Sequence, residues 1–595
     1  MSKKDSLQKY MAKIEDVLKK TLQELQFPKI EIQLEHPKEE SHGDYSANVA
    51  FLLSKELKKS PLKIADEIVK KMKKPDFISD ISVAAPGFIN FTFAPEVFLE
   101  ELQSIDEKYG SSEWGKGKKW SIEHTSPNPN KAMHIGHLRN NVIGMSLSKI
   151  WEYIGIEIVV DCMDNNRGIA ITKLMWGFLK FAHKNSEEKT DISYWYGHKD
   201  EWNTPESLGV RPDKFVDDLY VKGAGDFSSS KESETIVRQM VVDWEAKDKK
   251  TWALWELVLK YSYQGQQMTL QRLGNRWDKI WHEHEHYQEG KDFVEEGLKK
   301  GIFRKLEDGV ILTNLEKDYD LADTVVIKSD GTSLYITQDL SLTKIKKDTF
   351  RADKMFWVIG PEQSLALKQM FAVCEQLGIG KVEDFTHLSY GWMSIKGQEK
   401  MSSRLGNVIY IDDLVDIAKE GVLEKMKESN FPPEERNQIA EKVALAAVKY
   451  SILKVGRTMN IEFDMESSIS FEGNSGPYIQ YTFVRTKSIL KRLETKFDHT
   501  NVNIAHFEKQ EIDILRWVYR FGEVVEEAAK NYSPHLLCTY LFELAKRYNA
   551  LYNELQILKE EDEQKRNLRL LITEKVGIIL KKGMELLNIE MPERM

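Results

Sequence analysis

The chain has 595 residues, of which 41% are hydrophobic and 30% are charged, and its formal net charge is −9. A chain of this length exceeds what one hydrophobic core usually holds, so several domains are expected, and the composition is that of a globular protein rather than a disordered or fibrous one. The sequence has no run of about 18 apolar residues, which argues against a membrane-spanning helix, and the acidic balance requires any nucleic-acid contact to come from local basic patches.

Residues 1 to about 95 are predicted to form a small α+β unit. The charged start leads into an amphipathic helix rather than an apolar signal segment, so we expect a cytoplasmic protein without membrane contact. The segment Glu39–Ser46 precedes a second helix, and Ala85–Phe91 is the predicted closing strand. The glycine-containing stretch Tyr109–Gly117 then indicates a boundary between this unit and the next.

The next segment has the order strand, loop, helix, strand. Apolar and polar residues alternate from Trp120 to Ile122, and the turn Ser126–Asn130 follows. Apolar residues then recur at spacings of three and four until Gly155, and Ile156–Val160 is a second strand. This pattern is the βαβ unit of a doubly wound nucleotide fold, in which the start of the helix favours phosphate.

Two short motifs stand out in this frame. His134-Ile135-Gly136-His137 lies at the start of the predicted helix, and Lys400-Met401-Ser402-Ser403-Arg404 lies much later in the chain. Imidazole and ammonium donors on two separate elements suit the stabilisation of charge on a triphosphate. Gly136 would let an adenine or ribose approach the backbone. Either motif alone also fits an interpretation without a function, as surface histidines at a helix start or as a solvated lysine.

The pattern between the two motifs changes twice. A polar, Trp-rich and helix-like stretch from about 178 to 285 is predicted to be an insertion in the core. The sheet is then predicted to resume through Val325–Lys328, Ser333–Ile336 and Met355–Ile359. From about Ala440 onward the spacing of apolar residues predicts helices almost throughout.

The three cysteines, Cys162, Cys374 and Cys538, are far apart in the sequence. Their spacing excludes a Cys-x-x-Cys zinc site and argues against a disulfide framework. We therefore expect buried cysteine side chains, no protein-bound zinc and no other resident metal.

The two motifs together resemble the signatures of the class I aminoacyl-tRNA synthetases, and their surroundings narrow the resemblance to the arginyl-tRNA synthetases. Glu123–Asn128 is similar to the arginine-binding strand end of that family, and Tyr335–Asp339 matches its Tyr-x-Thr-x-Asp element. Gly360–Gln363, His387–Gly391 and Ser470–Tyr481 extend the resemblance over most of the chain.

The resemblance implies an α/β fold with three domains. The expected Rossmann-like, doubly wound catalytic core spans 118–465, with the inserted helical subdomain and a Lys-Met-Ser-Ser-Arg loop region at 385–438. A small α+β N-terminal domain at 1–110 would touch the tRNA elbow. An all-α anticodon-binding domain would span 466–595, and we expect the protein to act as a monomer.

The resemblance also implies a reaction. L-arginine would be activated by ATP to arginyl-adenylate and transferred to the 3′-terminal adenosine of tRNA(Arg), with attack by the 2′-hydroxyl and with tRNA required in the first step. Mg²⁺ would enter with ATP as a substrate complex, since the sequence shows no dedicated cage of carboxylates.

By this resemblance, Glu123, Tyr335 and Asp339 would read the guanidinium group, which carboxylates and an aromatic ring suit. Ser126 and Asn128 would hold the amino-acid backbone. The implied catalytic residues are His134, His137, Lys400, Ser402, Ser403 and Arg404. The implied ATP-binding residues are His134, Gly136, His137, Lys400 and Met401. The implied arginine-binding residues are Glu123, Ser126, Asn128, Tyr335, Asp339 and Gln363. The implied tRNA-binding residues are Tyr478, Tyr481, Arg485 and Met595.

Three positions depart from the family pattern. Asn166 and Ala366 stand where an aspartate and a histidine are common, and Leu405 stands where a charged residue is more usual. Two alternative functions therefore stay open, a nucleotidyltransferase of cofactor synthesis and a catalytically silent tRNA-binding relative. For Asp339 alone, a helix-capping carboxylate is the competing interpretation.

Overall fold

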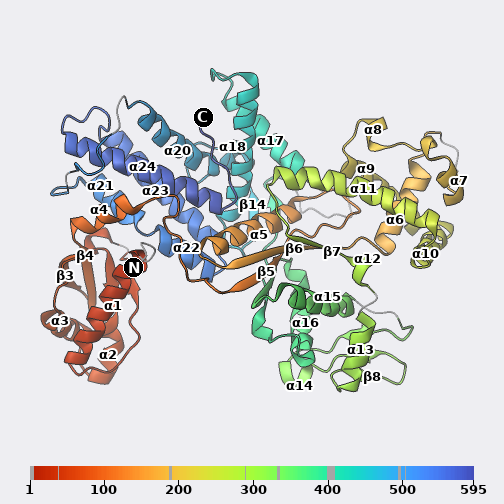
Figure 1. Ribbon diagram of the computed structural model, residues 1–595, viewed down its shortest axis with the longest axis horizontal. Helices are drawn as coiled ribbons and strands as arrows, with labels where there is room; N and C mark the ends of the chain where they lie inside the picture. The colour runs from red at the N-terminus through yellow and green to blue at the C-terminus, as the bar shows by residue number, and fades with distance from the viewer. Residues whose placement is uncertain are drawn as a thin grey trace.

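The computed structural model describes residues 6–37, 39–185, 190–287, 290–331, 335–397, 409–493, 497–502 and 504–595. The described chain is mostly helical and is built around a central parallel sheet (Figure 1). The predictions that lie outside the described residues are those for Lys400, Met401, Ser402, Ser403, Arg404, Leu405, the strand residues Ser333 and Leu334, and the side chain of Tyr335.

The N-terminal unit is an antiparallel sheet of strand order β1-β2-β4-β3 covered by helices (Figure 1, red). The predicted closing strand is β4, whose alternate residues Ile89, Phe91 and Phe93 are buried. Its elements are α1 (Ser6–Glu24), β1 (Leu34–Glu35), η1 (Glu40–His42), β2 (Tyr45–Ala47), α2 (Val49–Leu57), α3 (Pro61–Lys71), β3 (Ile78–Ala84), β4 (Phe88–Phe93) and α4 (Pro95–Ser104).

The central sheet is doubly wound, as the sequence predicts. All neighbouring pairs in the order β12-β11-β5-β6-β7 are parallel, so the order reverses between β5 and β11. Such a reversal leaves a crevice at the carboxyl ends of the two strands. The elements are β5 (Lys119–Glu123), α5 (Ile135–Tyr153), β6 (Glu157–Asp164), β7 (Lys279–His282), α15 (Tyr335–Phe350), β11 (Lys354–Trp357), η3 (Pro361–Gln363), α16 (Ser364–Leu377), η4 (Val382–Asp384) and β12 (Phe385–His387).

A helical subdomain with its own hydrophobic core stands between β6 and β7, at the right of Figure 1. Its helices begin at Ile169 and end at Arg272, whereas the sequence predicts an insertion from about 178 to 285. The predicted range therefore includes β7, an edge strand in which only Trp281 is buried and which has no alternating pattern. The elements are α6 (Ile169–Phe181), α7 (Ile192–Gly197), η2 (Lys199–Glu201), α8 (Pro205–Leu208), α9 (Pro212–Ser229), α10 (Lys231–Glu245) and α11 (Lys249–Arg272).

The segment after β7 corrects two strand predictions. Val325–Ile327 is a strand, but it belongs to a small antiparallel sheet of order β10-β9-β8 and not to the central sheet. The strand predicted at Ser333–Ile336 is wrong at its end, because α15 already begins at Tyr335 and buries Thr337 and Leu340 on one face. The remaining elements are α12 (Glu283–His286), α13 (Gly290–Lys299), β8 (Arg304–Lys305), β9 (Ile311–Leu312), α14 (Glu316–Tyr319) and β10 (Val325–Ile327).

The C-terminal part is almost wholly helical, as predicted. It begins with β13 (Met393–Ile395), α17 (Ile411–Lys425), α18 (Pro433–Leu453), β14 (Ile461–Phe463) and α19 (Met465–Ser468), and β13 pairs with β14 in parallel. It ends with α20 (Gly476–Lys491), α21 (Lys509–Val518), α22 (Phe521–Lys530), α23 (Pro534–Glu554) and α24 (Glu563–Leu586).

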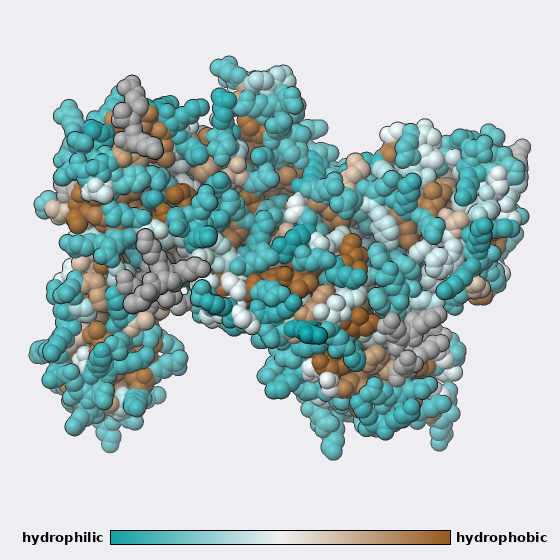
Figure 2. All heavy atoms as spheres, in the orientation of Figure 1, coloured by the Kyte–Doolittle hydropathy of each residue, from teal (hydrophilic) through white to brown (hydrophobic). Residues whose placement is uncertain are grey.

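One hydrophobic core joins the N-terminal unit, α5 and the C-terminal helices. Trp151 of α5 is fully buried in it and donates a hydrogen bond from Nε1 to the carbonyl of Ala529, at 3.0 Å. The three cysteines are buried and free. In the space-filling view of Figure 2 the visible face is largely hydrophilic. Among the helices that the structure describes, none has the length and apolar character that a membrane span needs.

Candidate active site

A cavity of about 480 Å³ lies at the carboxyl ends of β5 and β11. This is the point where the strand order reverses, and ligands of doubly wound sheets bind there. The cavity is continued by a second one of about 470 Å³, because Asn128 and Asn165 line both. The sequence-predicted residues that line the first cavity are Glu123, Ser126, Asn128, His137, Asp339 and Gln363.

A buried lysine at the base of this cavity is absent from the sequence-based prediction. Nζ of Lys346 lies 2.6 Å from Oε2 of Glu123 and 2.5 Å from Oδ2 of Asp161. Burial opposes the ammonium charge, but the carboxylates of Asp161 and Glu123 outweigh it and raise the pKa of Lys346. Burial also raises the pKa of Asp161 to about 6, against the lowering effect of Lys346.

Asp339 lies on the same face of α15 as Lys346, two helical turns earlier. Water can reach its side chain through the cavity, yet the surrounding protein reduces its hydration. This loss of hydration, with the nearby charge of Glu123, raises the pKa of Asp339 to about 7. Counting full charges, Glu123, Asp161, Asp339 and Lys346 give the pocket a net charge of about −2, which favours a cationic ligand.

The loop after β5 is held close to Glu123. Oγ of Ser126 donates a hydrogen bond to Oε1 of Glu123 at 3.3 Å and accepts one from the backbone N–H of Met163 at 3.1 Å. The exposed Asn128 follows two residues later. The loop therefore places a hydroxyl and an amide beside the carboxylate.

The two histidines of the first motif form a cap at the start of α5. Nδ1 of His134 accepts a hydrogen bond from the N–H of Gly136 at 3.1 Å, and Nδ1 of His137 accepts one from the N–H of His134 at 3.1 Å. Burial and the charge of Lys131 lower the pKa of His134 to about 4, and burial lowers the pKa of His137 well below its usual value. Both rings are therefore neutral at pH 7, and with Nδ1 as acceptor each carries its proton on Nε2.

The chain that follows the second motif is bonded directly beside the first. The N–H of Ile135 donates to the carbonyl of Ile409 at 3.2 Å, and the N–H of Ile411 donates to the carbonyl of Met133 at 3.1 Å. Ile409, the first described residue after the second motif, therefore lies beside the start of α5.

Arg139 is a further residue that sequence reasoning missed. It is 1% exposed, and its guanidinium group donates to the carbonyls of Gly391, Trp392, Arg457 and Met459 at 2.5 to 2.9 Å. Burial lowers its pKa to about 10. Arg139 therefore ties α5 to the start of β13 and to the approach to β14.

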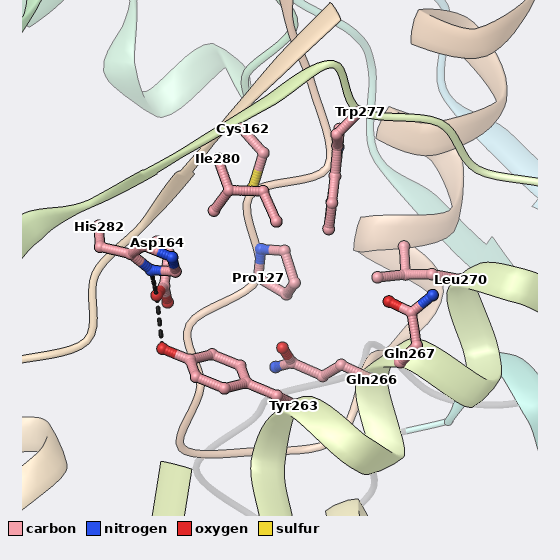
Figure 3. Close-up of a pocket in the computed structure, with 10 residues that line it drawn as sticks. All are labelled: Pro127, Cys162, Asp164, Tyr263, Gln266, Gln267, Leu270, Trp277, Ile280 and His282. Atoms are coloured by element: carbon pink, nitrogen blue, oxygen red, sulfur yellow. Dashed lines mark hydrogen bonds and ion pairs between the residues drawn. The ribbon is translucent and has the colours of Figure 1, made fainter. Parts of the chain in front are cut away.

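The positions that depart from the family pattern differ in surroundings. Ala366 lines the main cavity. Asn166 is buried, and its Nδ2 lies 2.9 Å from Nδ1 of His284. Asp164 accepts hydrogen bonds nearby from Tyr263, at 2.5 Å, and His282, at 2.6 Å, which Figure 3 shows at the edge of a third cavity. The side-chain hydrogen bond to Asp164 raises the pKa of His282.

Three of the four predicted tRNA-binding residues, Tyr478, Tyr481 and Arg485, lie together on α20. The guanidinium of Arg485 lies over the rings of Tyr481 and Tyr552, 5.0 and 4.4 Å from their centroids. Nη1 of Arg485 donates a hydrogen bond to Oδ1 of Asn549, and Nδ2 of Asn549 donates one to the hydroxyl of Tyr478 at 2.9 Å. Met595 follows the last helix and packs against the hydrophobic core that joins the N-terminal unit, α5 and the C-terminal helices. Tyr552 and Asn549 on α23 have no sequence signal, because only the packing of α20 on α23 brings them there.

No group of three or more His, Cys, Asp or Glu side chains in the described ranges has an arrangement that could hold a metal ion.

Three family models match the chain. The model described as "tRNA synthetases class I (R), catalytic domain" matches residues 99–194 and 198–465. The model described as "Arginyl tRNA synthetase N terminal domain" matches residues 10–93, and "DALR anticodon binding domain" matches residues 479–595.

Curated relatives resemble the chain over nearly its whole length. Arginine–tRNA ligase of Parabacteroides distasonis is 35% identical, with 95% of this chain and 96% of the relative covered. The enzyme of the same name from Bacteroides thetaiotaomicron is 34% identical, with 97% and 98% covered.

Two solved structures have the same fold. Thermus thermophilus arginyl-tRNA synthetase aligns with a TM-score of 0.79 at 22% identity and covers 98% of this chain and 100% of its own. Plasmodium falciparum arginyl-tRNA synthetase aligns with a TM-score of 0.79 at 18% identity and covers 98% and 99%.

Proposed function

Because the chain belongs to the arginyl-tRNA synthetase family, we propose that its main cavity binds arginine with the guanidinium group between Glu123 and Asp339. The chain is an arginine–tRNA ligase and uses ATP, arginine and tRNA. The observation that carries the pocket assignment is the pair of carboxylates at the strand-order reversal, because a planar cation with five donors is best bound by acceptors on more than one side.

In this proposal Ser126 and Asn128 bind the amino and carboxyl groups of arginine, and Gln363 contacts the substrate from the opposite wall. Oε1 of Glu123, which accepts only the Ser126 hydroxyl among the described side chains, is the oxygen that receives the guanidinium. A site with a buried acceptor such as Glu123 also rejects neutral amino acids, which would leave that acceptor unpaired.

His134 and His137 supply the phosphate contacts. Each neutral ring presents an N–H at Nε2, so the pair can donate to the α-phosphate oxygens as negative charge builds in the transition state. Gly136 leaves space for the adenosine, and Lys400 with the residues that follow it completes the clamp. Mg²⁺ enters with ATP and is held by its phosphates. Positioning and charge stabilisation then suffice, and no protein nucleophile is needed.

The terminal 2′-hydroxyl of tRNA(Arg) then attacks the carbonyl carbon of arginyl-adenylate, and AMP leaves. We assign the anticodon arm to Tyr478, Tyr481, Arg485 and Met595, since aromatic faces stack on unpaired bases. The assigned domains are 1–110 for the tRNA elbow, 118–465 for catalysis and 466–595 for the anticodon. A cytoplasmic monomer is part of the same proposal.

The test is ATP/pyrophosphate exchange with each of the twenty amino acids, with and without tRNA. We expect exchange with arginine alone, and only in the presence of tRNA. Exchange with another amino acid, or exchange indifferent to tRNA, would contradict the specific assignment. Failure to form arginyl-tRNA with a cognate transcript would instead favour a catalytically silent relative.

A further inference from the structure

The loop that carries Asn128 has cavities on both of its sides. Ser126 and Asn128 line the arginine cavity, whereas Pro127 between them lines a separate cavity of about 170 Å³. Figure 3 shows Pro127 facing Tyr263, Gln266 and Leu270 of α11 across this space. Close packing therefore does not fix the loop from behind, and its position depends on hydrogen bonds.

Met163 and Asn165 bond the side chains of Ser126 and Asn128, and three further hydrogen bonds to the loop come from one helix, α11. Oγ of Ser262 donates to the carbonyl of Pro129 at 2.6 Å, and Nε2 of Gln266 donates to the carbonyls of Asn128 at 3.1 Å and Lys131 at 3.4 Å. Ser262 is 1% exposed and Gln266 5% exposed. Two buried side chains, one helical turn apart, thus hold three carbonyls of the loop that leads to His134.

The end of the same helix is bonded to the last part of the chain. The carbonyl of Leu273, directly after α11, accepts hydrogen bonds from Nζ of Lys449 at 2.8 Å and Nδ2 of Asn588 at 3.1 Å. Nζ of Lys449 also donates to the carbonyl of Asn588 at 2.7 Å. Lys449 is buried, so these carbonyls are its partners in a place that water does not fill.

The C-terminal segment continues this connection to the surface assigned to the anticodon. Nε2 of Gln480 on α20 donates to the carbonyl of Glu590 at 2.7 Å, between Asn588 and Met595. Gln266 lies seven residues before Leu273 on one rigid helix, a distance of about 10 Å. The C-terminal segment, α11 and the Asn128 loop are therefore joined by contiguous hydrogen bonds.

We propose that α11 positions the arginine-binding loop according to the state of the C-terminal helices. Gln266 is the positioning residue at the loop, and Lys449 with Asn588 connects α11 to the helices that bind tRNA. This inference rests on the proposed function. A tRNA on α20 and the C-terminal segment strengthens arginine binding through this connection, and arginine strengthens tRNA binding by the same factor.

The experiment measures the dissociation constant of arginine for the whole protein, with and without saturating tRNA. The ratio of the two constants is the coupling factor. We expect Asn588→Gly to leave arginine binding by the free protein within twofold and to lower the coupling factor by about three- to tenfold. Glycine suits this position, because Asn588 has a φ of 57° and glycine keeps that backbone while removing the amide.

Gln266→Ala should weaken arginine binding in the free protein by about three- to tenfold and should also lower the coupling factor. Combining it with Asn588→Gly should lower the coupling factor no further than the larger single effect, because both act on one connection. Lys449→Met is a second probe of the junction between α11 and the C-terminal segment, and it is measured only if the thermal unfolding of this variant remains cooperative.

Two matched controls accompany these variants. Gln267→Ala removes an exposed side chain of α11 that lines the same cavity of about 170 Å³ as Gln266 but makes no side-chain hydrogen bond to another described residue. Lys442→Met removes an exposed ion pair between α18 and Glu590. Both should keep the wild-type coupling factor. A wild-type factor of one, or a factor unchanged by Asn588→Gly and Gln266→Ala, overturns the inference. Absence of arginyl-tRNA formation by the wild type overturns the proposed function instead.

Discussion

The ammonium group of Lys346 lies 2.6 Å from the carboxylate of Glu123 and 2.5 Å from that of Asp161, at the base of the cavity assigned to arginine. The cation therefore fixes the direction of the carboxylate that we assign to the guanidinium group. A positive residue in a pocket for a positive ligand has a clear physical role, since Lys346 opposes the rise that burial causes in the pKa of Asp161 beside Glu123.

Lys346→Met should raise the KM for arginine by about tenfold or more, with a smaller effect on kcat, because Glu123 then loses the partner that fixes its direction and Asp161 loses the cation that opposes its protonation. Lys346→Arg keeps the cation and should recover most of the affinity. The matched control is Lys344→Met on the same helix, which removes an exposed ion pair with Asp348. A wild-type KM in Lys346→Met would contradict this role.

Arginine binding should depend on pH through Asp339. Its pKa is about 7, so below that pH the carboxyl is protonated and neutral, and raising the pH through 7 restores the charge that the guanidinium needs. The dissociation constant of arginine should fall by up to about tenfold per pH unit between pH 5 and 7 and level off above that. Asp339→Asn should bind weakly at every pH and lack this step; a pH-independent constant in the wild type would refute the assignment.

The first histidine should act in the chemical step rather than in arginine binding. His134→Asn keeps a side chain that can cap α5, but it removes the imidazole donor, so we expect kcat for exchange to fall about 10²- to 10³-fold with little change in the KM for arginine. Because the pKa of His134 is about 4, the wild-type rate should show no histidine titration between pH 6 and 8. Steady-state kinetics over that range give both readouts.

Arg139→Met should destabilise the protein strongly. The substitution leaves the carbonyls of Gly391 and Met459 without a donor and removes one of the two donors of Trp392 and Arg457, at a cost of about 3 to 5 kcal/mol. We expect a lower midpoint of thermal unfolding, followed by circular dichroism. Arg436→Met, at a partly exposed arginine of α18, is a size-matched comparison that should leave the midpoint nearly unchanged.

Tyr552→Ala should raise the KM for tRNA about 5- to 100-fold, because the ring is exposed beside Arg485 and base stacking contributes about 1 to 3 kcal/mol. Tyr552→Phe keeps the ring and should stay near the wild type. Asn553→Ala, at the exposed neighbouring position, serves as the control in the same aminoacylation assay. An equal loss in the phenylalanine variant would point to the hydroxyl instead of stacking.

The doubly wound core was predictable because its signals are local. The alternation at Trp120–Ile122, the turn before His134 and the apolar spacing of α5 each lie within one element. β7 gave no such signal, because it is a short edge strand with one buried residue. Tyr335 and Ile336 misled the strand prediction, because four residues of alternation cannot be told from the first turn of a helix.

Asp161 and Lys346, the two members of the charge network around Glu123 that the sequence did not predict, are brought there by contacts between distant parts of the chain. Asp161 meets Glu123 only because the register of β5 and β6 makes them partners. Lys346 joins them because its side chain reaches from α15 to both strands, and no spacing in the sequence records that approach. Tyr552 needs α23 beside α20 in the same way. Site residues within a motif were therefore accessible to prediction, and their supporting partners were not.

The burial of Trp151 against Ala529 also bears on how the chain is made in the cell. The indole emerges from the ribosome long before the helices that cover it, and at translation rates of about 5 to 20 residues per second those partners follow after roughly 20 to 90 s. During that time the outer face of α5 is an apolar surface without its cover, so the nascent protein is expected to depend on chaperones until its last helix has been synthesised.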